Sequence, residues 1–231
     1  MSMAGEVKAV SVMWTEIPKE VEHDLNEWYD REHVKNRVDI PGYLWGKRYR
    51  AVHGGPTYMA VYATEGPHVQ AGDEFLKVVT SPTVGETEFA PHFFNSIRMM
   101  CDVTASVGDA EGGFAGFLMV TPREGAADAL RSYIVDIALP GLVAHHGIMA
   151  AHLWARNDET TAMASRGFPE DNLPKSMMAP DWLLAYEGTS LEDVMAAKTA
   201  LLPESAFRSR GAHPDLLFAA MQLTYRYGHG G

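Results

Sequence analysis

The pattern of apolar and polar residues alternates between two periods along the first hundred residues. Short runs rich in β-branched residues predict strands, and apolar residues at three- and four-residue spacing predict helices. The elements follow the order β-α-β-β-α-β, which is the ferredoxin-like unit. In chain order they are a strand at 7–14, a helix from Pro18 to before Pro41, hairpin strands at 43–52 and 57–64, a helix at 67–79, a short helical turn at 83–88 and a strand at 92–103.

The second half of the chain repeats this order. Shifting one half by 105 positions places Gly42 on Gly147 without a gap, although few residues are identical. The repeat predicts domains at 1–105 and 114–231, joined by the Gly-rich, acidic linker 106–113. The elements of the second half are a strand at 114–121, a helix at 125–139, strands at 147–157 and 181–188, a helix after Ser190 and a strand at 215–227.

A ferredoxin-like sheet carries helices on one face and needs a partner for the other face. Both faces of the predicted strands are apolar, and the second copy can supply that partner. We therefore predict an α+β fold in which two antiparallel sheets face each other in an intrachain α+β barrel with pseudo-twofold symmetry. The alternative is two separate domains on a linker, which would expose a large apolar patch.

The composition narrows the class of partner. A net charge of −11 argues against binding to nucleic acid or anionic lipid, because both reward clustered Lys and Arg. No apolar run approaches the roughly 18 residues that span a bilayer, and the start of the chain lacks a secretory signal, so we expect a cytoplasmic protein. Cys101 is the only cysteine, which excludes an intramolecular disulfide and a zinc site with two thiolates. We expect a small-molecule substrate, no metal and no cofactor.

One segment carries most of the chemical signal. The sequence WYDREHV at 28–34, followed by DIPGYLWGKRY at 39–49, resembles the dimeric α+β-barrel superfamily and, within it, the EthD-like group. In that group a histidine commonly follows an aromatic-rich helix and precedes a Pro-Gly-aromatic turn. The resemblance implies the barrel fold and a possible homodimer. It leaves the reaction open among lactone isomerases, polyketide cyclases, cofactor-free monooxygenases, decarboxylases, dehydratases and haem proteins.

The motif makes His33 the candidate general acid/base, because an imidazole exchanges a proton near neutral pH. Tyr29 lies one helical turn earlier, where its hydroxyl could orient the imidazole. Glu32 falls on the apolar stripe of the helix, so we expect either a partner, with Arg48 as the candidate, or a raised pKa. Each residue has a structural alternative: a buried histidine bonded to a carbonyl, a core tyrosine and a structural ion pair.

The predicted hairpin supplies candidate substrate-binding residues. Tyr49, with Tyr58 and Tyr62 from the neighbouring strand, could line a pocket for a flat or aromatic substrate, although such aromatic residues more often belong to a core. Arg48 could stabilise negative charge that develops on the substrate. The predicted binding set is Arg48, Tyr49, Tyr58, Trp28 and Arg98, and Asp30 and Arg31 are expected to be solvated.

The second half offers weaker signals. Ala138 stands at the position of His33, so the site is predicted in the first half only. His152 lies in the middle of a predicted strand and could be a haem ligand, but no H-E-x-x-H motif supports a metal site. The insertion 158–180 could be a lid over a pocket, a subunit contact or a loop without defined structure.

No phosphate-binding loop, dinucleotide fingerprint or nucleophile elbow is present, so proton-transfer chemistry is the class that remains. We predict a cofactor-independent lyase or isomerase that acts on a small aromatic or cyclic carbon compound, with His33 as general acid/base and Tyr29 and Glu32 assisting. The alternatives are a monooxygenase or haem-binding redox enzyme of the same fold, and a non-catalytic small-molecule binding protein.

Overall fold

The computed structural model describes residues 6–167 and 179–228. The first half contributes β1 (Ala9–Glu16), α1 (Glu22–Trp28), η1 (Tyr29–His33), α2 (Val34–Val38), β2 (Tyr43–His53), β3 (Tyr58–Thr64), η2 (Pro67–Ala71), α3 (Asp73–Val79), α4 (Val84–Phe89), η3 (Ala90–His92) and β4 (Phe94–Val107). The second half contributes β5 (Phe114–Val120), α5 (Ala127–Tyr133), η4 (Ile134–Ala138), α6 (Leu139–Ala144), β6 (Ile148–Arg156), α7 (Asp158–Ser165), β7 (Trp182–Gly188), α8 (Leu191–Leu201), α9 (Glu204–Ser209) and β8 (Leu217–Gly228).

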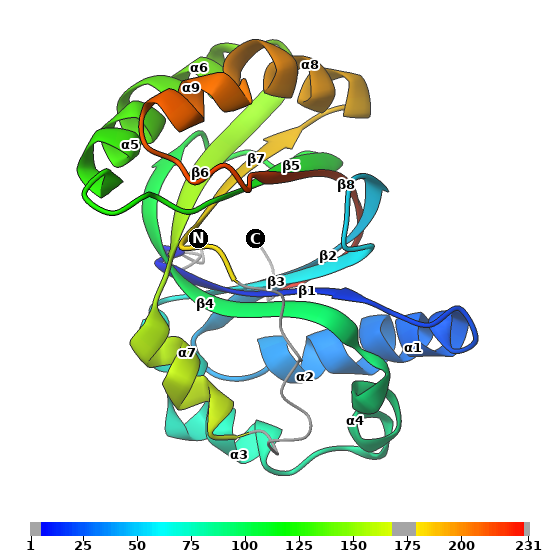
Figure 1. Ribbon diagram of the computed structural model, residues 1–231. Helices are drawn as coiled ribbons and strands as arrows, with labels where there is room; N and C mark the ends of the chain where they lie inside the picture. Colours follow the sequence, from blue (N-terminus) through cyan, green and yellow to red (C-terminus); the bar gives the residue numbers. More distant parts are fainter. Residues whose placement is uncertain (1–5, 168–178, 229–231) are drawn as a thin grey trace, which may run out of the picture.

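The strands close one antiparallel barrel in the order β1-β3-β2-β8-β5-β7-β6-β4. Each half forms a four-stranded sheet, β4-β1-β3-β2 and β8-β5-β7-β6, and the pairs β2–β8 and β4–β6 join the two sheets. Figure 1 shows the barrel between two layers of helices, with α5, α6, α8 and α9 on one side and α1 to α4 on the other. The predicted α+β barrel with pseudo-twofold symmetry is confirmed, and two separate domains on a linker are excluded.

The repeat extends to irregular details of the backbone. Gly42 and Gly147, which the 105-residue shift superimposes, both have a positive φ, at 88° and 74°. Such a backbone favours glycine, which explains why both turns before the hairpin strands keep this residue. The strands that follow the two turns each carry a register shift at their first residues, in β2 and in β6.

The first helix of each half contains a π-helical turn at the same place. η1 joins α1 to α2, and η4 joins α5 to α6. A π turn accommodates one extra residue, so later residues face the sheet at shifted positions. The buried stripe of the first helix therefore runs from Leu25 to Val34, and Glu32 is left half-buried at its flank. The sequence predicted one regular helix here and so placed Glu32 on the buried stripe, which is wrong.

Three apolar clusters hold the layers together. One fills the barrel interior around Trp14, Tyr49 and Phe117. The second lies between the sheet and the second-half helices, and the third between the sheet and the first-half helices. The barrel interior around Trp14, Tyr49 and Phe117 is therefore a packed core.

The predicted insertion 158–180 begins with a helix. α7 follows β6, and Ala164 belongs to the apolar cluster under the first-half helices. Figure 1 shows α7 beside the first-half helical layer rather than with the other second-half helices. Residues 168–178 of the insertion lie outside the described residues, and the proposed lid role of this segment stays a prediction.

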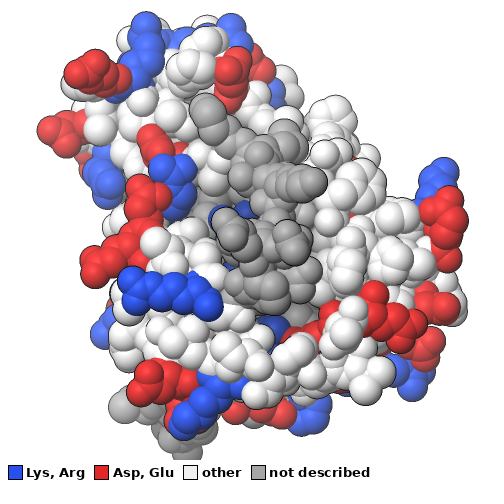
Figure 2. Space-filling model, turned by 60° about the horizontal axis from the view of Figure 1, so that its bottom comes forward, with Lys and Arg blue, Asp and Glu red and all other residues white. Residues whose placement is uncertain are grey.

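The surface shows no single dominant charge feature on the face that Figure 2 presents, where acidic and basic side chains are interspersed over the described residues. Among those residues, no helix combines the length and the apolar character needed to cross a membrane.

Candidate functional site

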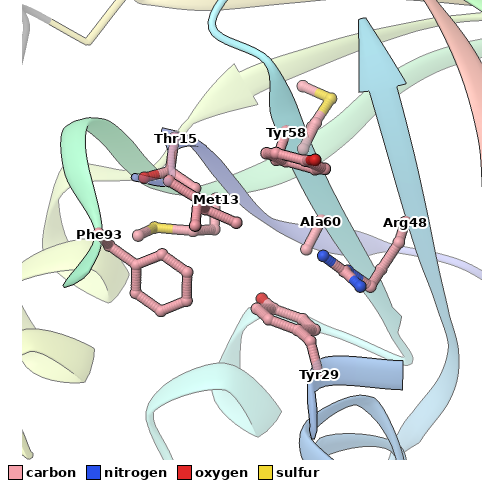
Figure 3. Close-up of a pocket in the computed structure, with 9 residues that line it drawn as sticks. Met13, Thr15, Tyr29, Arg48, Tyr58, Ala60 and Phe93 are labelled. Atoms are coloured by element: carbon pink, nitrogen blue, oxygen red, sulfur yellow. The ribbon is translucent and has the colours of Figure 1, made fainter. Parts of the chain in front are cut away.

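A small cavity lies between the sheet and the first-half helices. Its volume is about 10 Å³, close to the space of one water molecule. Strands β1, β2 and β3 supply one wall, and η1 and Phe93, which lies between η3 and β4, supply the other (Figure 3). The lining residues are Met13, Thr15, Ile17, Tyr29, Arg48, Tyr58, Met59, Ala60 and Phe93. Three of the predicted site residues, Tyr29, Arg48 and Tyr58, are thus brought together.

Arg48 is the cation of this cavity, and its side chain is almost fully buried. Its Nη1 donates to Asp30 Oδ1 at 2.6 Å, and its Nη2 donates to Asn26 Oδ1 at 2.6 Å. The guanidinium also lies over the Tyr29 ring, 4.1 Å from its centroid. The predicted pair of Arg48 with Glu32 is wrong, because Asp30 takes this role and Glu32 accepts a hydrogen bond from Thr83 Oγ1 at 2.5 Å. Asp30, expected to be solvated, is therefore part of the site.

Tyr29 presents its phenol to the cavity as a neutral hydrogen-bond donor. Burial raises the pKa of Tyr29, and the positive charge of Arg48 offsets that rise only in part. The Tyr62 hydroxyl donates to Tyr29 Oη at 3.4 Å. Because this oxygen already accepts from Tyr62, the hydroxyl proton of Tyr29 is available to a bound molecule.

Tyr58 and Thr15 supply the other hydroxyl groups on the wall. The Tyr58 hydroxyl donates to the carboxylate of Glu22, and burial raises the pKa of Tyr58. Thr15 Oγ1 lies 2.6 Å from Ser96 Oγ. Figure 3 shows Thr15 and Phe93 on the side of the cavity away from Arg48. The cavity therefore has polar groups at both ends and apolar side chains between them.

His33 lies behind Tyr29 and is not among the residues that line the cavity. Its ring packs against Tyr29 and Trp28, with centroid distances of 4.5 and 4.9 Å. Burial, and then the charge of Arg37, lower the pKa of His33 to about 4, so the imidazole is neutral at pH 7. The catalytic role of His33 stays a prediction. His33 does not line the cavity, so it would affect a ligand there indirectly, through its contact with Tyr29.

Glu86 on α4 balances the positive charge of Arg37 next to His33. Its Oε1 accepts from Arg37 Nη2 at 2.5 Å and lies 3.4 Å from His33 Nδ1. Burial alone would raise the pKa of Glu86, but His33 and Arg37 lower it to about 2. Glu86 also completes a capping box with Thr83, so one carboxylate ties α4 to the first helix.

The remaining predicted binding residues lie elsewhere. Tyr49 points into the barrel core, where its ring meets Phe117 at a centroid distance of 5.5 Å, so its predicted association with Tyr58 is wrong. Trp28 packs against Phe89 at 5.3 Å, one layer outside the cavity. Arg98 is half-buried near Tyr43, and burial lowers its pKa to about 10.

Several cavity residues were missed although the sequence contains a signal for them. Met13 and Thr15 alternate along β1 with Val12 and Trp14, which belong to the barrel core. The period of two places them on the helix-facing side of the sheet, where the cavity lies. Phe93 gives no such signal, because it precedes the first residue of β4.

The corresponding place in the second half is filled by apolar residues. Ile134, Ala138 and Leu153 stand where the first half has Tyr29, His33 and Arg48. All three are buried in the cluster that also contains the Tyr186 side chain. The polar groups of the first half are therefore not required to build this fold.

Neither a family model nor a curated protein sequence matches the chain. Solved structures do match over nearly the whole length. An anthrone oxidase-like protein has a TM-score of 0.64 at 13% identity, with 100% of this chain and 97% of that chain covered. A proposed monooxygenase from Fusobacterium nucleatum subsp. nucleatum has a TM-score of 0.62 at 12% identity, with 97% and 96% covered. This is the dimeric α+β-barrel fold.

The same dimeric α+β-barrel fold occurs in a haem-binding protein from Thermus thermophilus, with a TM-score of 0.50 at 10% identity and 94% and 91% of the two chains covered. Identities this low show the fold alone, and the EthD-like group stays a prediction. Another proposed monooxygenase and a chlorite dismutase are also among the proteins with a similar structure.

The small cavity that Tyr29, Arg48 and Tyr58 line does not fit a haem. Pockets for organic ligands are roughly 300–1,000 Å³, whereas the cavity here is about 10 Å³ and no histidine lines it. His152 lies on the barrel side of β6, where Nδ1 is 2.9 Å from Ser106 Oγ and the ring stacks on Trp154. Within residues 6–167 and 179–228, no group of three or more His, Cys, Asp or Glu side chains is arranged to hold a metal ion.

Proposed function

We propose that the protein is an enzyme that removes a proton from a small aromatic or cyclic compound and oxidises the resulting anion with dioxygen, without a cofactor. The observation that carries the proposal is that Tyr29 and Arg48, from η1 and β2, line the same small cavity. The fold neighbours support oxidation over the lyase or isomerase reaction predicted from sequence.

The two groups favour an anion for simple electrostatic reasons. A guanidinium in a buried, water-poor site stabilises a phenolate or enolate oxygen more than it would in water. The Tyr29 hydroxyl adds a second donor to the same oxygen. Met13, Ala60 and Phe93 supply apolar contacts to a ring and exclude water.

The proton has an acceptor on the wall itself. Tyr58 lines the cavity and donates to Glu22, so a proton released by the substrate can pass to the Tyr58 oxygen as Tyr58 gives its own proton to Glu22. His33, the acid/base predicted from sequence, is neutral at pH 7 and lies behind Tyr29. We assign the proton transfer to Tyr58 and Glu22, and His33 to positioning of Tyr29.

The oxidation balances without an added reductant. A ring CH₂ group loses one proton to give the anion, and the anion supplies electrons to dioxygen. One oxygen atom becomes the new carbonyl oxygen, and the second leaves as water with the two hydrogens of the original CH₂. A lyase or isomerase would use the same anion and consume no oxygen, so oxygen uptake separates the two functions.

The test is oxygen consumption by the purified protein with a panel of anthrones and cyclic 1,3-diketones, each with and without a carboxylate substituent, in the presence and absence of EDTA. Oxygen uptake that EDTA leaves unchanged is expected, and Tyr29→Phe and Arg48→Met should each lower kcat/KM by roughly a hundredfold. Arg210→Met is the matched control, because Arg210 stacks on Tyr133 in the second half at 4.0 Å, as Arg48 stacks on Tyr29. Turnover at an equal rate under nitrogen would show that the protein is a lyase or isomerase and would refute the proposed oxidation.

A further inference from the structure

An open hollow lies on the outer side of the first helix, next to the buried cavity. Its volume is about 500 Å³, and it is lined by His23, Asn26, Glu27, Asp30 and Arg31. Two of these residues, Asn26 and Asp30, also hold the guanidinium of Arg48 on the cavity wall. Arg48 and its two partners are thus the partition between the outer hollow and the cavity.

The ion pair in this partition is asymmetric. The Arg48 side chain is only 5% exposed, whereas the Asp30 side chain is 34% exposed. A buried guanidinium needs an anionic partner, because an unpaired buried charge is costly. A carboxylate that already faces solvent can be released into water at much lower cost. The cation therefore stays in place, and the anion is the member that can be exchanged.

We propose that Asp30 is an exchangeable counter-ion of Arg48, which an anionic substrate displaces on entry, so that Asp30 sets both the charge selectivity and the affinity of the site. The inference rests on the proposed function and narrows its substrate to compounds that carry an anionic group, such as a carboxylate, in addition to the ring CH₂ group that loses a proton. Displaced from Arg48, the Asp30 carboxylate regains water in the outer hollow, where Arg31 and His23 also line the wall.

The exchange also accounts for the small size of the cavity. A space of about 10 Å³ cannot hold a ring, so a neighbouring group has to move before a substrate enters. Asp30 is that group, because its release from Arg48 opens the partition toward the outer hollow while Arg48 stays in place. A neutral molecule offers no replacement for the carboxylate and leaves the partition closed, whereas an anion compensates the guanidinium as Asp30 leaves.

The test uses benzoate and benzamide, which have the same shape and differ in charge at pH 7.5, and measures Kd by isothermal titration calorimetry. Asp30→Asn should bind benzoate about two- to fivefold more tightly than the wild type, the factor expected for removal of a competing, partly exposed ion pair. Benzamide should show no such gain. Asp30→Ser removes the same charge with a smaller side chain, so the comparison holds even if Asp30→Asn fails to fold.

Glu27→Gln is the matched control. Glu27 lines the same hollow and loses the same charge on substitution, but it pairs with Arg31 at 3.0 Å rather than with Arg48. This variant should bind benzoate with the wild-type Kd. An equal or weaker benzoate affinity in both Asp30 variants, or an equal gain in Glu27→Gln, overturns the inference. If the Asp30 variants behave as expected but no compound of the oxidation panel consumes oxygen, the inference stands and the oxidation fails.

Discussion

The neutral, buried His33 predicts a specific loss of stability in mild acid. An unfolded chain protonates a histidine near pH 6.5, whereas burial and the charge of Arg37 lower the pKa of His33 in the folded protein to about 4. Between these two pH values the unfolded state binds more protons, so acid favours unfolding. The stability that His33 contributes is complete above pH 6.5 and is lost as the pH falls toward 4.

The size of the effect follows from the two pKa values. A pKa difference of one between the folded and unfolded states corresponds to about 1.4 kcal/mol, and the linkage expression gives a loss of about 2 kcal/mol between pH 7.5 and pH 5. The His33→Gln variant lacks this titration but keeps an amide beside Glu86. Between pH 7.5 and pH 5, the free energy of unfolding of this variant should fall by about 2 kcal/mol less than that of the wild type, whatever its stability at pH 7.5.

The assay is urea denaturation of wild type and variant at pH 7.5, 6 and 5, followed by far-UV circular dichroism. His23→Gln, which removes an exposed histidine from α1, should retain the wild-type pH dependence. Parallel curves for wild type and His33→Gln would show that the imidazole is not held neutral. They would also remove the argument that His33 supports Tyr29 from a water-poor position.

Three further substitutions test the packing of the second half and of the site. Gly116→Ala should lower stability by about 1–3 kcal/mol in urea denaturation, because a Cβ at Gly116 would lie 2.2 Å from the buried Tyr186 ring; full wild-type stability would contradict the close packing. Ala60→Val should abolish the thermal shift caused by benzoate, because its methyl groups enter the cavity; an unchanged shift would place the ligand elsewhere. The double variant Arg48→Leu with Asp30→Val should be about as stable as the wild type, because the pair joins a buried arginine to a carboxylate that is 34% exposed, and such pairs contribute little net stability. A loss above roughly 1 kcal/mol in urea denaturation would refute this expectation.

The barrel was predictable because its signals are local and occur twice. Each strand and helix shows its own period, and the 105-residue repeat of the order gives two sheets that each need a partner. Arg48 and Tyr49 are adjacent in β2, so the period of two of a strand puts them on opposite faces of the sheet. The sequence of one strand does not reveal which residues of the next strand it pairs with. Tyr49 pairs with Met59, so Tyr49 and Met59 share a face of the sheet and Tyr58 lies on the opposite face.

The error at Asp30 has a different origin. A regular helix read from Leu25 places Glu32 toward the sheet, and nothing in the residue types marks a π turn within 29–33. The extra residue of the π turn shifts the buried stripe to Val34 and leaves Asp30 within reach of the long Arg48 side chain. One added residue in the backbone thus decides which carboxylate partners the buried cation.

The comparison of the two halves separates what the fold needs from what the site needs. Both halves share the π turn, the positive-φ glycine and the strand order, and in the second half Leu153 simply packs in the apolar core. Arg48 at the equivalent position in the first half requires two hydrogen-bonded partners and a tyrosine ring to be accommodated. Since buried ion pairs are weak sources of stability, packing does not explain why this position holds an arginine. A cavity bounded by that arginine and open to exchange with the outer hollow does explain it.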